Sequence, residues 1–346
     1  MKNEKLKIAI IGSGAITKSQ HLPAVLRSPQ AELYALVDSQ RENAEDLRHK
    51  FALKCKVFTD MNDVLGEVDG VIIATPNHTH YPLAKAALEK SIPVLIEKPM
   101  TTTYAHAVEL AELAEKNNTF ILVGYKTRYL PNVRLMKRLL EQGYLGKPIH
   151  YHYEFGSRGG WAPLSGYNLS REKSGGGVMV VTGTHFLDRM LYWFGEPESF
   201  EFFDDSYGGV EANCKAHFHF KNQLGAFTGS FFFSKSIPLK NKFVMETEKY
   251  WVEMTEVDAE TIYLFPKDNP EIRLEVCDRD IETGQKLDVY FQEQFEEFAA
   301  NIRQYKGVAC DGRFGALSLK WIEAFYANRQ QLEEPWLEPY KTNGEK

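Results

Sequence analysis

A lysine directly follows an apolar run in the segment Glu97-Lys98-Pro99, and its ammonium group is a candidate for proton transfer. The run 93–96 before it predicts a buried strand, so Lys98 would lie at the carboxyl edge of a sheet. Partial burial there lowers the pKa of a lysine toward the range in which it exchanges protons. The alternative is a surface lysine that pairs with Glu97.

A short glycine-rich segment is a candidate for binding phosphate. Gly12 and Gly14 follow the first apolar run and precede Ala15, Ile16 and Thr17. Missing side chains let a backbone turn sharply and approach a pyrophosphate, which the free N–H groups of the following helix can then bind. The usual third glycine is replaced by Thr17. The segment predicts a dinucleotide site that includes Ala15 and Ile16, and the alternative is a plain strand–helix turn.

Asp38, at the end of the second predicted strand, bears on the choice of dinucleotide. A carboxylate in this place accepts hydrogen bonds from a ribose diol and repels a 2′-phosphate, which favours NAD over NADP. Arg41 is close enough in sequence to accept that phosphate, so NADP remains possible. Asp38 could also serve as the N-cap of the following helix.

Two other segments carry polar groups that suit a ligand. Thr75-Pro76-Asn77 follows the apolar strand 71–73 and lies at the carboxyl edge of the sheet, where ligands bind, although it could be only a turn. The region 156–173 is polar and aromatic. Its aromatic faces suit a polyhydroxy ligand and its arginines suit a carboxylate or phosphate, while the alternative is a solvated loop. The residues concerned are Arg158, Trp161, Tyr167, Asn168 and Arg171.

These residues are positioned by strands and helices that alternate in the first third of the chain. Strands are expected at 8–11, 33–38, 57–58, 71–75, 93–96 and 120–124, and helices at 15–28 with a break at Pro23, 41–51, 61–65, 81–90 and 103–117. Such alternation predicts an α/β, Rossmann-type, doubly wound parallel sheet.

The pattern changes after residue 125. A helix is expected at 131–141, strands at 149–157, 199–204, 214–220, 224–233, 242–245, 250–253 and 261–265, and further helices at 185–194, 289–305 and 316–331. This predicts an α+β domain with one large, mostly antiparallel, open-faced sheet. The expected domains are therefore 1–125, which binds the dinucleotide, and 126–346, which binds the substrate.

Composition excludes several classes of protein. The chain has 346 residues and a formal net charge of −6, which argues against partners such as nucleic acid or an anionic membrane. Its four cysteines form no CxxC pair, so we expect no metal site and free thiols in the cytoplasm. No apolar run approaches the ~20 residues of a membrane helix.

Taken together, the motifs resemble the glucose-fructose oxidoreductase/inositol dehydrogenase/MocA family. The resemblance is carried by Gly12-x-Gly14, Thr75-Pro76-Asn77-x-x-His80, Glu97-Lys98-Pro99, Gly124-Tyr125-x-x-Arg128-Tyr129-x-Pro131, Gly175-Gly176-Gly177 and Gly183-x-His185-x-x-Asp188. It covers nearly the whole chain. The Glu-Lys-Pro motif together with the glycine block is fairly specific, whereas neither would be alone.

The resemblance implies an NAD(P)-dependent oxidoreductase that transfers a hydride between nicotinamide and a hydroxyl or keto group of a sugar or polyol. Lys98 would hydrogen-bond the reacting oxygen, and His185 would be the general acid/base or its partner. The cofactor would be contacted by Thr75, Pro76, Asn77, His80 and Glu97, and the substrate by Tyr125, Arg128, Arg158, Trp161, Thr182 and His185. The second domain would form homo-oligomer contacts, in a dimer or tetramer, through its sheet.

The sequence departs from the family pattern at one position. Members commonly carry an aspartate four residues before the histidine, and here Val181 occupies that position. Valine can neither orient an imidazole nor share a proton. Either Lys98 and His185 suffice, or Thr182 or Thr184 assists, or catalysis is weakened. The competing hypotheses are a non-catalytic regulator that senses NAD(P) or a sugar, and an NADPH-linked reductase of another small molecule.

Overall fold

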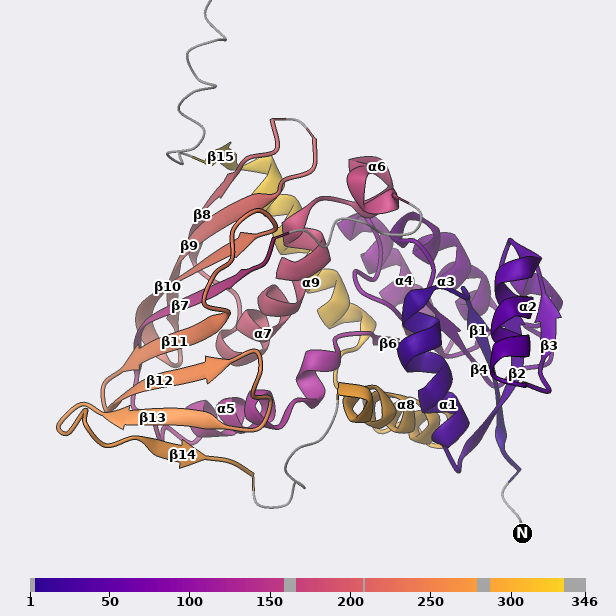
Figure 1. Ribbon diagram of the computed structural model, residues 1–346, viewed down its shortest axis with the longest axis horizontal. Coiled ribbons are helices and arrows are strands. Elements are labelled where there is room, and N and C mark those ends of the chain that lie inside the picture. The colour runs from indigo at the N-terminus through magenta and orange to yellow at the C-terminus, as the bar shows by residue number, and fades with distance from the viewer. Residues whose placement is uncertain (1–3, 159–165, 208, 279–286, 333–346) are drawn as a thin grey trace, which may run out of the picture.

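The computed structural model describes residues 4–158, 166–207, 209–278 and 287–332, which form two sheets with helices packed on and between them (Figure 1). The first sheet, sheet A, is parallel, with the strand order β3-β2-β1-β4-β5-β6. Its strands are β1 (Leu6–Ile11), β2 (Ala31–Val37), β3 (Lys56–Phe58), β4 (Gly70–Ile73), β5 (Val94–Ile96) and β6 (Ile121–Val123). The order reverses direction at β1, as in a doubly wound fold, so the predicted fold of this region is confirmed.

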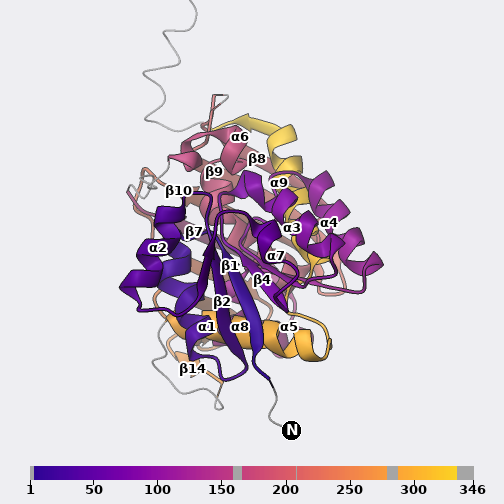
Figure 2. The ribbon, with the colours of Figure 1, turned by 90° about the vertical axis from the view of Figure 1, so that its right-hand side faces the viewer.

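Helices cover both faces of sheet A, which explains why its central strands are apolar on both sides. In Figure 2 the strands β1 and β4 stand between α2 on one side and α3 and α4 on the other. The helices of this region are α1 (Leu22–Arg27), α2 (Arg41–Lys50), α3 (His80–Glu89) and α4 (Tyr104–Lys116), with short turns η2 (Met61–Asp63), η3 (Asn77–Thr79) and η4 (Lys126–Tyr129). The helix expected at 15–28 is divided at Pro23: a wider π-type turn, η1 (Thr17–His21), leads into α1, which begins beside the proline.

The second sheet, sheet B, has the strand order β14-β13-β12-β11-β7-β10-β9-β8-β15 and is mostly antiparallel. Only β7–β10 and β8–β15 pair in parallel within the described residues. Its strands are β7 (Pro148–Gly156), β8 (Ser199–Asp204), β9 (Asn213–Asn222), β10 (Gly225–Ser234), β11 (Lys242–Thr247), β12 (Tyr250–Thr255), β13 (Ile262–Pro266), β14 (Leu274–Val276) and β15 (Arg329–Gln331). The predicted α+β region with a large sheet is confirmed.

One face of sheet B packs against helices through aromatic side chains. Tyr151 stacks on Phe194, and Tyr153 packs on Phe186, with ring centroids 5.0 and 4.1 Å apart. Because side chains alternate along a strand, His150 and His152, which alternate with these tyrosines, face away from the helices. The remaining helices and turns of this region are α5 (Pro131–Glu141), η5 (Tyr167–Leu169), α6 (Arg171–Ser174), η6 (Met179–Gly183) and α7 (Thr184–Phe194).

The last two helices, α8 (Leu287–Arg303) and α9 (Gly312–Ala327), return to sheet A. Phe295 and Phe298 of α8 share a buried cluster with Leu95 and Leu122, on the face that also carries α1. Gly312 of α9 lies against Ala111 of α4, close enough that an added Cβ would be 3.2 Å from the alanine Cβ. The second region of the sequence therefore completes the packing of the first.

Two details of the second region differ from the sequence-based expectation. The helix expected at 316–331 ends at Ala327, and Arg329–Gln331 forms the edge strand β15 beside β8 instead. The other edge strand, β14, was not predicted, because Leu274–Val276 is short and mostly exposed. Short edge strands carry little hydrophobic alternation, so they leave a weak pattern in the sequence.

Candidate functional site

The glycine-rich segment after β1 forms a tight turn at the carboxyl edge of sheet A. Gly12 has a φ of +98°, and a Cβ added there would lie 2.4 Å from the carbonyl oxygen of Ala74, so only glycine fits. A Cβ on Gly14 would meet no atom within 4 Å. Thr17, which replaces the third glycine, donates a hydrogen bond from its hydroxyl to the Gly12 oxygen at 2.7 Å. Thr17 therefore stabilises the turn that the glycines make.

Asp38 lies beside this turn. One carboxylate oxygen accepts a hydrogen bond from the Ser13 amide at 2.8 Å, and the other accepts from Gln40 N at 3.0 Å and Asn43 Nδ2 at 3.2 Å. The N-cap residue of α2 is Gln40, so the alternative of Asp38 as that N-cap is wrong. Arg41 is exposed and pairs with Glu45 at 3.2 Å.

His80, expected to contact the cofactor, is instead fully buried between two loops. One ring nitrogen lies 2.9 Å from the Pro99 oxygen and the other 2.8 Å from the Thr75 oxygen. Burial lowers the pKa of the ring despite these two acceptors. Both nitrogens are taken by the protein, so His80 holds the Thr75 loop to the segment after β5 and has no free nitrogen for a ligand.

Asn77 is likewise held by the protein, because its amide donates to the Ser174 oxygen at 2.8 Å, which ties η3 to α6. Thr75 accepts a hydrogen bond from the Thr79 hydroxyl at 2.7 Å. Pro76, the N-cap of η3, makes no side-chain cap bond. The predicted cofactor contacts of this segment therefore reduce to its backbone and to Thr75.

Glu97 contacts a histidine that no sequence motif singles out. Its Oε1 lies 2.8 Å from Nε2 of His21, a buried residue at the end of η1, and its Oε2 accepts from the Lys98 amide at 3.2 Å. Burial alone would raise the pKa of Glu97, but the hydrogen bond with His21 and the charges of His21 and Lys98 lower it. Glu97 is therefore an ionised anchor between the glycine-rich segment and the Lys98 loop.

The Lys98 ammonium does not form an ion pair with Glu97, so the alternative of a surface pair is wrong. Lys98 is half-buried, and its Nζ donates to the carbonyl oxygen of Val181 at 2.9 Å. Burial, together with the charges of Lys126 and Lys235, lowers the pKa of Lys98 to about 8, with Glu97 opposing the change. Lys98 can therefore exchange a proton near neutral pH.

His185 lies at the start of α7, close enough to Lys98 for the two charges to interact. Its Nδ1 is buried and has no hydrogen-bond partner within the described residues. Burial, and then the charges of Lys98, Lys126 and Arg189, lowers the pKa of His185 well below its ordinary value. The ring is therefore neutral at physiological pH, with one nitrogen ready for a ligand. Lys98 and His185, the two predicted catalytic residues, thus come together.

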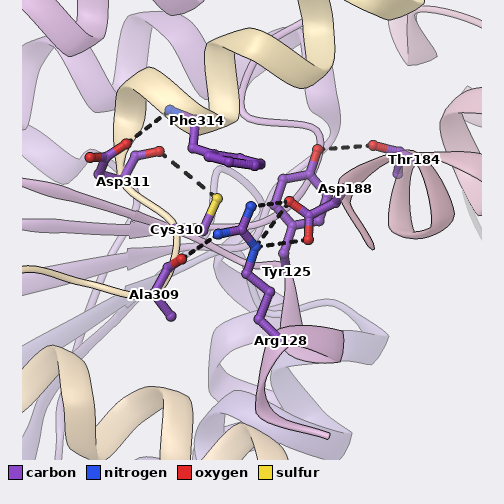
Figure 3. A network of polar contacts seen from close by, with 8 residues as sticks. All are labelled: Tyr125, Arg128, Thr184, Asp188, Ala309, Cys310, Asp311 and Phe314. Carbon is purple, nitrogen blue, oxygen red and sulfur yellow. Dashed lines mark hydrogen bonds and ion pairs between the residues drawn. The ribbon is translucent and has the colours of Figure 1, made fainter. Parts of the chain in front are cut away.

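Arg128 does not border an open pocket, contrary to the sequence-based expectation (Figure 3). Its guanidinium is almost fully buried and binds both carboxylate oxygens of Asp188, with Nη2 and Oδ1 2.8 Å apart, and also the Ala309 oxygen. The ring of Phe314 lies over it, 3.8 Å from Cζ to the centroid. All its donors face protein groups, so Arg128 joins η4, α7 and the segment before α9.

Tyr125 is also buried rather than at the edge of a pocket. It is 1% exposed, and its hydroxyl lies 3.0 Å from the Thr184 hydroxyl (Figure 3). Its ring meets that of His185 edge-on, with centroids 6.2 Å apart. Tyr125 therefore packs against the imidazole of His185 and contacts the Thr184 hydroxyl.

The remaining predicted substrate residues are placed as follows. Arg158 is exposed just after β7, and Thr182 is half-buried within η6. Trp161 lies outside the described residues. Tyr167 is half-buried in η5, and the Arg171 guanidinium packs over the Tyr326 ring.

Sequence reasoning missed Glu211, which organises the turn before His185. This buried carboxylate accepts hydrogen bonds from the amides of Gly177 and Met179, both at 2.9 Å, and from the Tyr326 hydroxyl at 2.7 Å. A Cβ on Gly177 would lie 2.1 Å from the backbone carbonyl oxygen of Glu211, which explains the glycine at this position. Glu211 precedes β9 without any motif, so nothing in the sequence marked it.

The part of the chain that the structure describes holds no cluster of three or more histidine, cysteine or acidic residues that could bind a metal ion. None of its helices combines the length and the low polarity that crossing a bilayer requires.

Comparison with known families decides the identity of the chain. Residues 6–125 match the sequence profile described as "Oxidoreductase family, NAD-binding Rossmann fold", and residues 133–252 match the "GFO/IDH/MocA C-terminal domain". The chain belongs to the Gfo/Idh/MocA family of oxidoreductases. The resemblance drawn from the motifs is thereby confirmed.

Individual relatives of this Gfo/Idh/MocA protein act on sugars or polyols by name. An "Inositol 2-dehydrogenase 4" of Saccharopolyspora erythraea is 34% identical over 44% of this chain and 46% of its own length. A "Glucose-6-phosphate 3-dehydrogenase" of Bacillus subtilis is 30% identical over 54% of this chain and 53% of its own. The aligned part of the chain thus spans about half the length of the curated relatives it matches.

Structural similarity extends further than sequence similarity. A levoglucosan dehydrogenase solved in complex with NADH superposes with a TM-score of 0.84 over 94% of this chain and 97% of that one, at 18% identity. At this identity the likeness establishes a shared two-domain fold.

Proposed function

We propose that this protein is an NAD-dependent dehydrogenase that oxidises a CH–OH group of a sugar or polyol, or reduces the corresponding keto group. The observation that carries the proposal is the convergence of Lys98 and His185 beside the carboxyl edge of an NAD-binding sheet. The names of the relatives, which are dehydrogenases of inositol and of a sugar phosphate, support the same reaction class.

The residues around Gly12 fit a dinucleotide. The space over Gly14 is open, and the buried Ser13 hydroxyl has no partner within the described residues, so it can donate to a phosphate. Asp38 lies next to this turn and can accept hydrogen bonds from a ribose. Arg41 is engaged by Glu45, which favours NAD over NADP. When bound, the nicotinamide would supply the hydride chemistry.

The protein's own side chains transfer the proton and orient the substrate. Lys98, in its neutral form, takes the proton of the substrate hydroxyl at Nζ, and in the reverse direction it returns that proton. The Val181 carbonyl oxygen accepts a hydrogen bond from this Nζ and holds it in place. The backbone of Val181 thus provides a polar contact that the valine side chain cannot provide. His185, neutral and with a free Nδ1, hydrogen-bonds the substrate and fixes its orientation.

Replacing Lys98 with methionine tests the proposal. We expect Lys98→Met to lower turnover by ~100-fold or more, because a positioned acid/base contributes about that factor. Turnover would be followed by the absorbance of reduced cofactor over a panel of sugars, polyols and their phosphates. Lys116→Met, an exposed lysine at the end of α4, is the matched control. NADH binding should survive in both variants.

The same experiment separates the rival hypotheses. Cofactor binding without turnover of any compound would favour a sensor of NAD(P) or sugar. Turnover that Lys98→Met leaves unchanged would remove Lys98 from the mechanism. Tighter binding of NADPH than of NADH would favour the NADPH-linked reductase, because Asp38 should disfavour a 2′-phosphate.

The assembly and cellular location of the protein are also proposals. The face of sheet B opposite the helices, here called the outer face, carries His150, His152, His217, His219 and the 42% exposed Trp251. We propose that two or four copies associate through the outer face, because it is a large sheet surface that no element covers in the described residues. Four free cysteines and an NAD requirement favour the cytoplasm.

A further inference from the structure

An excess of positive charge surrounds the proposed proton-transfer centre. Lys98 follows β5 and Lys126 follows the neighbouring strand β6, and these two strand ends are fixed side by side because the Gly124 amide donates to the Ile96 oxygen at 2.7 Å. Lys126 is half-buried, with its ammonium nitrogen 5.4 Å from the centre of the Phe291 ring. Both lysines are thus held at the same edge of sheet A.

A third lysine reaches this place from sheet B. Lys235 directly follows β10, and the alternation of β10 puts it on the same face as Phe233, toward the helices. Phe233 packs against η6, since a Cβ on Gly183 would lie 2.8 Å from its ring. The same turn η6 carries the Val181 oxygen that binds Lys98. In agreement with this placement, the positive charges of Lys126 and Lys235 both lower the pKa of Lys98.

None of these three lysines forms an ion pair with a carboxylate within the described part of the chain. The nearby acids are engaged elsewhere: Glu97 binds His21 at 2.8 Å, and Glu256 binds Arg189 at 2.8 Å. Unpaired cations that are partly buried are costly, so folded proteins seldom keep them without a reason. A general excess of basic residues does not explain these unpaired lysines, because the chain has 47 acidic and only 41 basic residues.

The cofactor does not supply the missing negative charge at this position. Its phosphates are expected at Gly12 and Gly14, and an oxidised nicotinamide ring is itself a cation. One further cation stands nearby on sheet B. Arg158 follows β7, which pairs with β10 up to the Gly156–Ser234 position, and it is exposed.

We propose that the substrate is an anionic sugar or polyol, whose carboxylate or phosphate group binds Lys126 and Lys235 while Lys98 takes the proton of the reacting hydroxyl. This proposal rests on the proposed function and names its substrate class. A carboxylate and a phosphate share the required chemistry, because both accept charge-assisted hydrogen bonds from ammonium groups. A neutral sugar would offer Lys126 and Lys235 no charged partner within ion-pair distance, because Glu97 and Glu256 act on Lys126 without forming an ion pair with it.

The test compares neutral sugars with their anionic counterparts on the NADH-loaded, full-length protein. Calorimetry would measure D-glucose, D-glucuronate and D-glucose 6-phosphate, and then the corresponding galactose and mannose triplets. At least one anionic member should bind about tenfold or more tightly than its neutral parent, since a hydrogen bond to a charged group contributes about 1.5–3 kcal/mol. The uronate and phosphate arms tell the two kinds of anion apart.

Variants locate the anion site. Lys126→Met and Lys235→Met should each weaken the anionic ligand about tenfold and leave its neutral parent and NADH unaffected. Lys116→Met, with the same change of charge on a distant surface, should change nothing. Two variants are used because either one alone could disturb folding.

Three results would overturn the proposal: equal binding of neutral and anionic members, no binding of any anion, or equal weakening of both by the variants. Failure of the proposed function looks different, since NADH itself would then not bind, or bound ligands would not be oxidised.

Discussion

Burial lowers the pKa values of both Lys98 and His185, the two residues to which we assign the proton chemistry. For both groups burial disfavours the charged form. The pKa of Lys98 falls to about 8, within reach of neutral pH, whereas that of His185 falls well below its ordinary value and out of the working range. In the proposed mechanism Lys98 therefore exchanges the proton, and His185 orients the substrate.

The pH dependence of the reaction follows from the Lys98 pKa. Oxidation requires the neutral amine, so kcat/KM for oxidation should rise as the pH increases through about 8 and level off above it. Keto reduction requires the ammonium form and should fall over the same interval. Initial rates from pH 6 to pH 10 in both directions measure this. A profile controlled by a group near pH 6 would assign the proton to another residue.

The sequence alone could single out residues whose role depends on their place just after a strand. Lys98 was found because it directly follows a buried strand, and Gly12 because it precedes the first helix. Arg128 was misassigned, because its partner Asp188 lies 60 residues later and sequence spacing does not show such a contact. The Val181 carbonyl could not be foreseen either, since a backbone oxygen has no residue-type signal.

At the scale of the elements, the ion pair of Arg128 with Asp188 holds η4 against α7. Both side chains are at most 4% exposed, so the ion pair is buried away from solvent. Removing one partner of such a pair leaves a buried charge without compensation, which is far more damaging than removing both.

A double-mutant comparison measures this contact. Asp188→Leu should lower the free energy of unfolding by about 3–5 kcal/mol, because the Arg128 guanidinium remains buried without its partner. The double variant Arg128→Met with Asp188→Leu should recover a large part of that loss. Urea denaturation followed by circular dichroism gives both values. If the single and the double variant are equally destabilised, the pair has no specific role.

Elements with strong periodicity were predicted well, and those shaped by tertiary contacts were not. The strands of sheet A appeared as apolar runs because both of their faces are buried. The π-type turn η1 places His21 beside Glu97, and local helix propensity does not reveal a contact between residues so far apart in the sequence. The edge strands β14 and β15 depend on neighbours that the sequence does not identify.

At the scale of the whole molecule, the outer face concentrates histidines in two rows across β7, β10 and β9. Thr228 lies between His150 and His219, and Ser230 lies between His152 and His217. Burial lowers the pKa of both His150 and His152; the carboxylates of Glu246 and Glu154 oppose this, and His217 adds to it. Neutral histidines can be buried in an interface more readily than charged ones.

Association through the outer face should therefore weaken in acid. As the pH falls from 7.5 to 5, His150 and His152 of separated protomers take up protons, which favours separation over burial. Light scattering during gel filtration would show the mass fall toward that of the 39.6 kDa monomer. The variant His150→Gln with His152→Gln should reduce this dependence. A mass that stays constant over the interval would place the interface elsewhere.

The return of α8 to sheet A has a consequence for how the chain is made. Sheet A is synthesised first, but the phenylalanines that cover one of its faces, Phe295 and Phe298, follow strands β7 to β14 in the chain. Until then Leu95 and Leu122 lack the phenylalanine side chains that bury them in the folded protein. The nucleotide-binding region therefore cannot complete its packing before α8 has been synthesised. Translation must therefore pass Phe298 before sheet A can acquire its complete cover.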